Sequence, residues 1–241
     1  MITFKNYINE AVQKSKPYSA HELLKNPTIV PKSPGLYFWW LKKEYAQKLG
    51  IKGGHTVNGS VLVYHGTGKD LNQRLVKWEL SDLKGIQLRV RKTATTSDWV
   101  KSKGVDSVKN LPGVAQPART LRALLKTHWL DYAATEEFLN NLHLTFAVVD
   151  IKAPISDKEA WKKEYHKKVV QKHETSIVKR YNPALNISQL ADKALKKERV
   201  LAGKVSKQKT LDYIKDLFGD DVDLSSSAAD IRAAIKNKQF N

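Results

Sequence analysis

Three short apolar segments have the length and composition of β-strands. Residues 35–41 are rich in aromatic side chains, residues 61–64 are apolar throughout, and residues 144–151 form the clearest strand pattern. Apolar runs of about four to eight residues, rich in β-branched and aromatic side chains, are typical of strands. We expect the first two segments to pair as an extended hairpin across a looped stretch that contains a tight turn at Asn58-Gly59.

Apolar residues spaced by three and four predict several helices. The longest runs from about residue 157 to 181, and Asn182-Pro183 ends it because proline disfavours helical geometry at the residue before it. Glu174 lies at the edge of its apolar stripe, one turn from Val170 and one turn from Val178. Further helices are expected at residues 2–12, 20–24 (beginning at Ser19 or Ala20), 69–80, 119–132, 135–142 (capped by Thr135) and 228–236, and a further strand at residues 86–90.

These elements predict a mixed α/β (α+β) domain with a small three-stranded antiparallel sheet flanked by helices. The chain of 241 residues is long enough to bury one full core and to carry a small appendage. We expect a helical lead-in at residues 1–32, the main domain at 33–188 with insertions at about 42–60 and 81–142, and a basic linker with a small helical region at 189–241.

The net charge of +18 favours an acidic partner, and nucleic acid is the usual one. No segment resembles a signal peptide or a membrane-spanning helix, so we expect a cytoplasmic protein without a membrane partner. The absence of cysteine excludes disulfides, thiolate zinc sites and cysteine nucleophiles. The histidines are scattered without the spacing of a zinc site.

Three short motifs occur in order along the chain. They are Gly35-Leu36-Tyr37, then Tyr64-His65-Gly66 with Arg74 eight residues further on, then Glu174 with Asn186 twelve residues further on. Together they resemble the GIY-YIG nuclease domain, over about residues 33–188. The string from Glu174 to Asn186 is also similar to the metal-site end of the nuclease module of bacterial nucleotide-excision repair.

The resemblance implies a divalent-metal-dependent endonuclease that hydrolyses phosphodiester bonds of double-stranded DNA. Glu174 would bind Mg²⁺ or Mn²⁺, because a lone carboxylate with phosphate oxygens and waters suits a hard cation. Arg74 would clamp the scissile phosphate. Tyr37 is a candidate general base, and Tyr64 would position water or phosphate. Asn186 would hold the loop that aims Glu174, or contact phosphate.

Three further residues have supporting roles in this interpretation. Gly35 and Gly66 are the structural glycines of the two tyrosine motifs. A free tyrosine, with a pKa near 10, is a poor base, so Tyr37 would need a nearby cation to lower its pKa. Lys69 is a candidate for that cation, or for a phosphate contact.

The chain departs from the usual family pattern at several points. A longer interval than usual separates Tyr37 from Tyr64, and an extended hairpin would accommodate it. His65 replaces the usual aliphatic centre of the second motif, and Trp78 stands where many members carry His, Lys or Tyr. A long insertion separates Arg74 from Glu174.

Other interpretations stay open. A catalytically inactive basic DNA- or RNA-binding protein could use the same scaffold, and an RNA-associated protein without nuclease ancestry would leave the motif residues far apart. Taken singly, Tyr37 and Tyr64 could be core aromatics, and Arg74 could form a surface salt bridge with Glu79 or Asp70.

The biological role is also open among homing, restriction, repair and phage DNA processing. The opening residues 1–11 resemble the starts of proteins from large tailed phages. Cleavage specificity and oligomeric state are not indicated by any motif.

Overall fold

The computed structural model describes residues 16–51, 54–80 and 132–186, together with isolated positions between 83 and 216. The chain divides into two compact units, residues 1–80 with 138–191 and residues 81–137 with 192–241. The sheet and the sequence motifs belong to the first unit. The helices expected at 2–12, 119–132 and 228–236, and the strand expected at 86–90, lie outside the described residues or almost wholly so.

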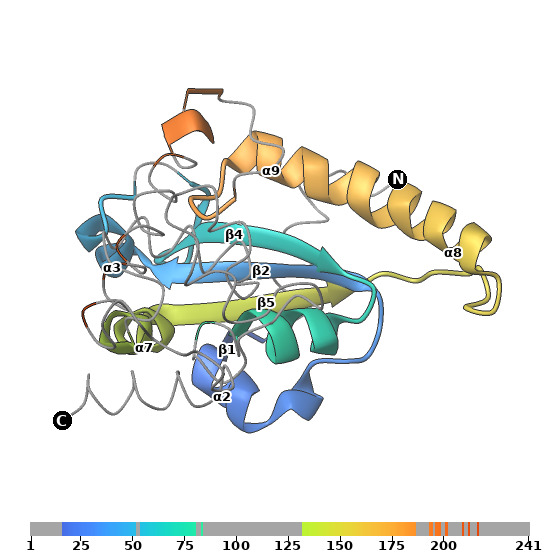
Figure 1. The fold of residues 1–241 in the computed structure, drawn as a ribbon, viewed down its shortest axis with the longest axis horizontal. Coiled ribbons are helices and arrows are strands. Elements are labelled where there is room, and N and C mark those ends of the chain that lie inside the picture. The colour runs from blue at the N-terminus through green and yellow to red at the C-terminus, as the bar shows by residue number, and fades with distance from the viewer. Residues whose placement is uncertain are drawn as a thin grey trace. The chain divides into compact units, whose positions relative to one another are not determined.

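The described strands form one antiparallel sheet in the order β1-β5-β2-β4-β3 (Figure 1). Their bounds are Tyr18–Ser19 (β1), Gly35–Lys42 (β2), Thr56–Val57 (β3), Ser60–Gly68 (β4) and Leu142–Val148 (β5). The three central strands are those expected from the sequence. The expectation of a three-stranded sheet was nevertheless wrong, because β1 and β3 extend it to five. Each of these outer strands has two residues, too few for an alternating pattern to be recognised.

The first two predicted strands do pair with each other, as β2 and β4. The tight turn is also present: Asn58 and Gly59 have φ values of 46° and 74°, the left-handed conformations that a two-residue hairpin turn of type I′ requires. It joins β3 to β4, however, and not β2 to β4. The expected loop between β2 and β4 therefore contains both β3 and a short helix, α3 (Lys43–Lys48).

Three shorter helices begin and end close to the expected residues. They are α2 (Ala20–Lys25), η2 (Asn72–Leu80, a π-helix) and α7 (Tyr132–Asn141). The 3₁₀ turn η1 (Pro27–Ile29) was not expected. Ser19, expected near the start of α2, caps it, and its hydroxyl accepts a hydrogen bond from the Glu22 N–H. Thr135 does not cap α7, because that helix already begins at Tyr132.

The long helix expected at 157–181 is continuous and has three parts. They are α8 (Lys158–Tyr165), the π-helix η4 (His166–Glu174) and α9 (Thr175–Tyr181). The Asp157 carboxylate caps its start by accepting a hydrogen bond from the Ala160 N–H. Asn182, just before Pro183, ends it in a left-handed conformation. Among the described helices, none is long and apolar enough to cross a membrane.

The two faces of the sheet are covered by different elements. Successive side chains of a strand point to opposite faces. On one face the long helix covers a core cluster, which consists of Leu36, Phe38, Trp40, Leu62, Tyr165, Val169 and Ile177. On the other face, Trp39 contacts Tyr64 and Phe138, with ring centroids 5.2 and 6.2 Å apart.

The ring of Tyr37 lies across the neighbouring strand at Gly66. The two residues are register partners in β2 and β4. A Cβ added to Gly66 would lie 2.2 Å from the Tyr37 hydroxyl oxygen and 2.4 Å from the ring carbon that bears it. Glycine is therefore required here for space, since its backbone is not in a left-handed conformation.

His65 is a fully buried part of the core. Its ring stacks on Phe38 with centroids 4.7 Å apart, and its Nδ1–H donates to the Tyr37 carbonyl at 3.1 Å. Burial lowers the pKa of His65 to about 3, so the ring is neutral. The histidine in place of an aliphatic residue thus disturbs neither the pairing nor the burial of this strand.

We predict that Gly66→Ala destabilises the protein by about 1–3 kcal/mol, the usual effect of overpacking a core. The added methyl group must displace the Tyr37 ring. Thermal or denaturant unfolding measures this directly. In a Tyr37→Ala background the space is vacated, so the same substitution should then change stability little. An equal loss in both backgrounds would contradict the steric account.

Protonation of His65 should contribute to acid destabilisation. The unfolded chain binds this proton below its ordinary pKa of 6.5, whereas the folded chain does not bind it until about pH 3. Stability should therefore fall as the pH is lowered through this window, by about 1.4 kcal/mol per pH unit from this group. His65→Phe, which keeps the stacking, should reduce the slope of unfolding free energy against pH. Parallel curves for the two proteins would refute the prediction.

Candidate active site

The antiparallel pairing of β2 and β4 brings the two tyrosine motifs together at one end of the sheet. Gly35 faces Gly68, and Tyr37 faces Gly66. The rings of Tyr37 and Tyr64 lie 6.1 Å apart between centroids, and both are buried. Gly35 also allows close packing, because an added Cβ would lie 2.2 Å from the carbonyl oxygen of residue 147 in β5.

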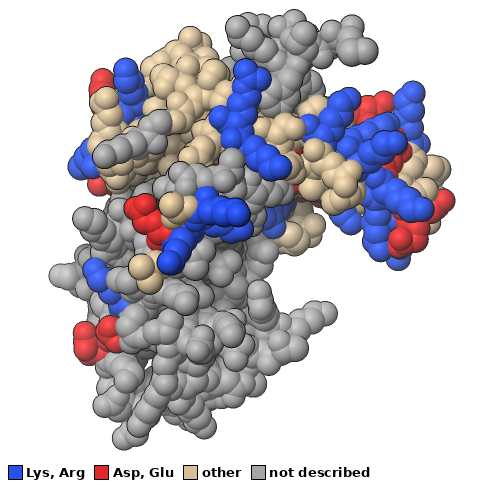
Figure 2. All heavy atoms as spheres, turned by 90° about the horizontal axis from the view of Figure 1, so that it is seen from above, with Lys and Arg blue, Asp and Glu red and all other residues tan. Residues whose placement is uncertain are grey.

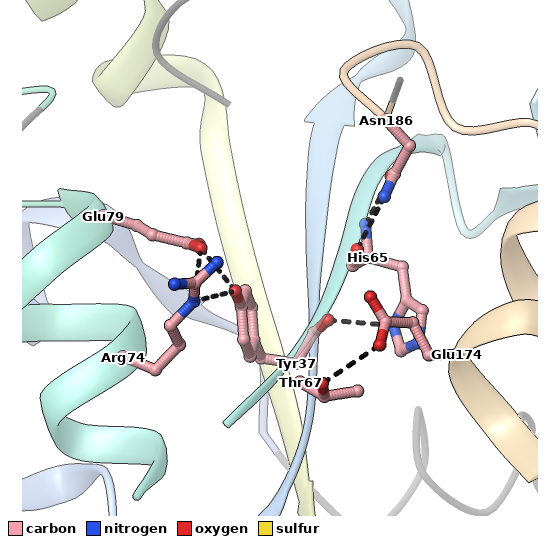
Figure 3. Close-up of polar contacts among 7 residues, drawn as sticks. All are labelled: Tyr37, His65, Thr67, Arg74, Glu79, Glu174 and Asn186. Carbon is pink, nitrogen blue, oxygen red and sulfur yellow. Dashed lines mark hydrogen bonds and ion pairs between the residues drawn. The ribbon is translucent and has the colours of Figure 1, made fainter. Parts of the chain in front are cut away.

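Arg74 reaches this pair of tyrosines from η2, the helix that follows β4. Its Nε lies 3.0 Å from Glu79 Oε1 and 3.4 Å from the Tyr37 hydroxyl (Figure 3). The Tyr37 hydroxyl in turn donates to Glu79 Oε1 at 2.5 Å. Arg74 therefore does pair with Glu79, one of the two partners weighed from the sequence. The pair is not a surface salt bridge, because the Glu79 side chain is completely buried.

The π-helical geometry of η2 explains how this contact forms. Arg74 and Glu79 are five residues apart, which in an α-helix of about 3.6 residues per turn places two side chains on different faces. A π-helix bonds each residue to the fifth one along, so its turn is wider. Arg74 and Glu79 then lie one above the other, and Glu79 joins the buried face with Leu75 and Leu80.

Both tyrosines are held in their protonated form. Burial and the Glu79 carboxylate raise the pKa of Tyr37 well above its ordinary value, and the same two causes raise the pKa of Tyr64. Arg74 acts in the opposite direction on both without reversing the shift. The structure thus gives Tyr37 the reverse of the lowered pKa that a general base needs.

Lys69 does not lie beside Tyr37. Its Nζ lies 4.9 Å from the centroid of the Trp161 ring, and Trp161 stacks on Tyr165 with centroids 5.4 Å apart. Lys69 is not among the groups that shift the pKa of Tyr37. The structure therefore does not support the idea that Lys69 lowers the pKa of Tyr37. The position of Lys69 does not bear on its expected contact with phosphate.

Glu174 lies on the other side of the paired strands, at the end of η4. Thr67 in β4 donates its hydroxyl hydrogen bond to Glu174 Oε2 at 3.2 Å (Figure 3). Burial raises the pKa of Glu174, while Thr67 and the nearby charge of Arg74 oppose that rise. The motif residues therefore form two halves, Tyr37, Tyr64 and Arg74 on one side and Glu174 on the other, separated by the end of β4.

The position of Glu174 also depends on a π-helical stretch. Nine residues separate Tyr165, which packs under the sheet, from Glu174. In an α-helix nine residues make about two and a half turns, which would point the carboxylate away from the sheet. The wider turns of η4, where Thr175 N–H bonds to Val170 O five residues back, return Glu174 to the inner side.

Asn186 binds the backbone of His65. Its Nδ2–H donates to the His65 carbonyl at 2.8 Å, and its Oδ1 accepts from the His65 N–H at 3.0 Å. Next to it, the Leu185 N–H donates to the Val63 carbonyl at 2.7 Å. Two roles were considered for Asn186. These contacts agree with the first, holding the loop after the Glu174 helix, because the Oδ1 and Nδ2 atoms of Asn186 both bind the His65 backbone.

The residues fit a single-carboxylate cation site. Within the described ranges, no three His, Cys, Asp or Glu side chains gather to hold a metal ion. A divalent cation at Glu174 would therefore complete its shell with water and phosphate oxygens, as Mg²⁺ commonly does. Its charge would also offset the cost of burying the Glu174 carboxylate.

The sequence motifs did not identify two residues of this arrangement as site residues. Thr67 directly follows the second tyrosine motif, and its hydroxyl orients Glu174. Glu79 was considered only as a surface partner of Arg74. A signal for its burial exists in the sequence, because Glu79 stands next to Leu80 in a run that also contains Leu75 and Val76. It becomes clear only when the helix is known to have π-helical spacing.

A model of the GIY-YIG catalytic domain matches residues 35–205, well over half of the chain. The match includes both tyrosine motifs and continues through the long helix and the loop that follows it. No curated protein and no solved structure matches the chain. The order of motifs, the paired strands that carry two of them and the domain match agree, and the chain belongs to the GIY-YIG nuclease family.

Proposed function

We propose that the protein is a divalent-metal-dependent endonuclease that hydrolyses phosphodiester bonds of DNA. The observation that carries this proposal is the placement of Arg74 and Glu174 on the two sides of residues 66–68 in β4. A phosphate bound at this strand end would meet a guanidinium from one side and a carboxylate-bound cation from the other. Positive charge on two sides of a phosphate is what stabilises the charge of its transition state.

Arg74 is oriented to bind the phosphate with its terminal nitrogens. Its Nε is engaged by Glu79 and Tyr37, and its guanidinium lies 6.0 Å from the centroid of the Trp78 ring. The ion pair with Glu79 is made through Nε, which leaves the terminal nitrogens as the groups that would contact phosphate. The planar guanidinium matches two phosphate oxygens. Burial acts to lower the pKa of Arg74, but Tyr37 and Glu79 outweigh it and raise the pKa, so the group stays charged.

Glu174 would hold Mg²⁺ or Mn²⁺. When bound, such a cation neutralises phosphate charge and lowers the pKa of a bound water. Thr67 orients the carboxylate through the hydrogen bond to Oε2. Asn186 holds the end of the Glu174 helix against β4 through His65. Tyr64, next to Tyr37 and within the field of Arg74, would keep its proton and position the phosphate or the water as a hydrogen-bond donor.

A row of lysines on the outer side of the Glu174 helix supports DNA as the partner. This lysine row consists of Lys158, Lys162, Lys167 and Lys172, all exposed and spaced by four or five residues. Those spacings are one turn in α8 and one turn in the π-helical η4. Figure 2 shows Lys and Arg side chains gathered over this helix.

The dimensions of the lysine row suit a nucleic-acid backbone. Fourteen residues at about 1.5 Å each give a row of roughly 21 Å. One DNA strand advances about 3.4 Å per nucleotide, so the row spans about six nucleotides. The row begins close to Glu174 and leads away from it, so duplex DNA would be bound mainly on one side of the scissile phosphate.

Cleavage of supercoiled plasmid with Mg²⁺ or Mn²⁺ tests the proposed function. We expect nicking or linearisation by the wild type, and its loss with EDTA. Glu174→Gln, which removes the charge at constant size, should lower the rate by more than the roughly 10–100-fold known for outer-shell partners of metal sites. Glu44→Gln, at an exposed position of α3, removes one carboxylate charge elsewhere; it is the control and should cut normally.

Each contrary result has a definite meaning. Activity that survives Glu174→Gln would show that the metal is held elsewhere. A wild type that shifts DNA in a gel but cuts nothing in either metal would instead establish a catalytically inactive DNA-binding protein on this scaffold.

Neutralising the lysine row should weaken DNA binding and its salt dependence together. Replacing all four residues by Gln should reduce the slope of log K against log salt by about 3–4, if each contacts one phosphate. The matched control replaces four other exposed lysines, Lys25, Lys32, Lys43 and Lys48. Fluorescence anisotropy with a short duplex measures both slopes. Equal losses in the two quadruple variants would show that the row is only part of a general positive charge.

A further inference from the structure

Glu79 is a completely buried carboxylate that contacts two of the motif residues. Its Oε1 accepts the hydrogen bond of the Tyr37 hydroxyl at 2.5 Å and lies 3.0 Å from Arg74 Nε. A buried carboxylate is costly unless it is paired and hydrogen-bonded, and Glu79 has both kinds of partner. Figure 3 shows the three side chains converging beside β2.

We infer that Glu79 is a positioning residue of the phosphodiesterase site, which orients Arg74 and retains the Tyr37 proton. The inference rests on the proposed function. It assigns Tyr37 to a supporting role as a neutral hydroxyl, and assigns the phosphate contact to Arg74.

The orientation of Arg74 follows from which of its nitrogens Glu79 binds. A carboxylate that contacts Nε fixes the plane of the guanidinium, because its three nitrogens lie in one plane. Tyr37, at 3.4 Å, and the Trp78 ring limit the same group on two further sides. The terminal nitrogens are therefore already oriented before phosphate binds, so binding costs little further side-chain entropy.

The protonation of Tyr37 follows from its neighbours. Among the described residues, the titratable or charged groups that face its hydroxyl are Glu79, Tyr64 and Arg74. Removing the Tyr37 proton would place a phenolate beside the Glu79 carboxylate, and two negative charges so close together repel each other. Burial adds to this cost, and Tyr37 has no measurable exposure in the structure.

Steady-state cleavage by single and double variants tests the assignment. Glu79→Gln should lower kcat about 10- to 100-fold with little change in KM, as expected for an outer-shell partner. Arg74→Ala should lower it by about 10²–10³-fold. The double variant should be no slower than Arg74→Ala alone, because Glu79 acts through Arg74. Glu44→Gln, an exposed carboxylate on α3, is the control and should behave as wild type.

The pH profile separates positioning from base catalysis. Tyr37→Phe should keep the shape of the kcat–pH profile and lose less than about tenfold in kcat, whereas loss of a general base costs about 10²–10⁴-fold. If Tyr37→Phe lost its activity and also changed the shape of the kcat–pH profile, Tyr37 would act as a base, and the conclusion that it keeps its proton would be wrong. Additive losses in the Arg74→Ala and Glu79→Gln double variant would overturn the coupling.

Thermal unfolding gives a readout that does not depend on cleavage. Arg74→Ala leaves Glu79 buried without its ion pair and should lower the Tm, and adding Glu79→Gln should raise it again. A further fall in Tm would refute the pairing even if every variant were inactive. If the wild type does not cut DNA but the Tm rises as expected, the proposed function fails while the Glu79–Arg74 contact stands.

Discussion

The last four residues of β4 hold the candidate site together. Thr67 binds Glu174, Gly66 gives space to Tyr37, and His65 binds Asn186 through its backbone. Gly68 packs against Arg74, since a Cβ there would lie 2.8 Å from the Arg74 Cβ. Side chains that are distant in the sequence are thus placed by successive residues of one strand. A shift of β4 by one residue would exchange its two faces and separate every one of these contacts.

Electrostatics divides the site into two halves of different character. On the Tyr37 side, a guanidinium and a carboxylate neutralise each other inside the protein, and the tyrosines stay protonated. On the Glu174 side, the carboxylate is partly buried and its hydrogen bond comes from a neutral hydroxyl. The first half is complete in the protein alone. The second has partial compensation from the charges of Arg74 and His166. In the proposed function a bound cation would add to it, which suits a division of labour between a fixed clamp and a metal site.

Much of this could be predicted from the sequence, because strand and helix patterns are local. The three central strands, the helix that begins at Ala20, the Asn58-Gly59 turn and the end of the long helix at Asn182 were all expected, and the structure confirms them. The motif order also identified the family. Two-residue strands such as β1 and β3 leave no pattern, since they depend on pairing with β5 and β4.

The details of the site could not be predicted in the same way. The Arg74–Glu79 pair was weighed from the sequence as a surface salt bridge, and its burial was not expected. A period of about 3.6 does not align the two side chains, whereas the π-helical turn does and places Glu79 on the buried face. Lys69 was considered as a cation for Tyr37 on the basis of charge alone. Its contact with Trp161, on a helix almost a hundred residues away in sequence, follows from no local rule.

The loop that carries Asn186 has a consequence beyond the site. Among the described residues, β3 pairs with Ser60 and Val61, so the later part of β4 lies at the edge of the described sheet. Leu185 occupies the C=O group of Val63, and Asn186 occupies the N–H and C=O groups of His65, which another polypeptide could otherwise use to extend the sheet. Exposed strand edges invite such pairing between molecules. The loop that follows the Glu174 helix thus also covers part of this strand edge, so that the edge and the geometry of the candidate site depend on the same Asn186 side chain.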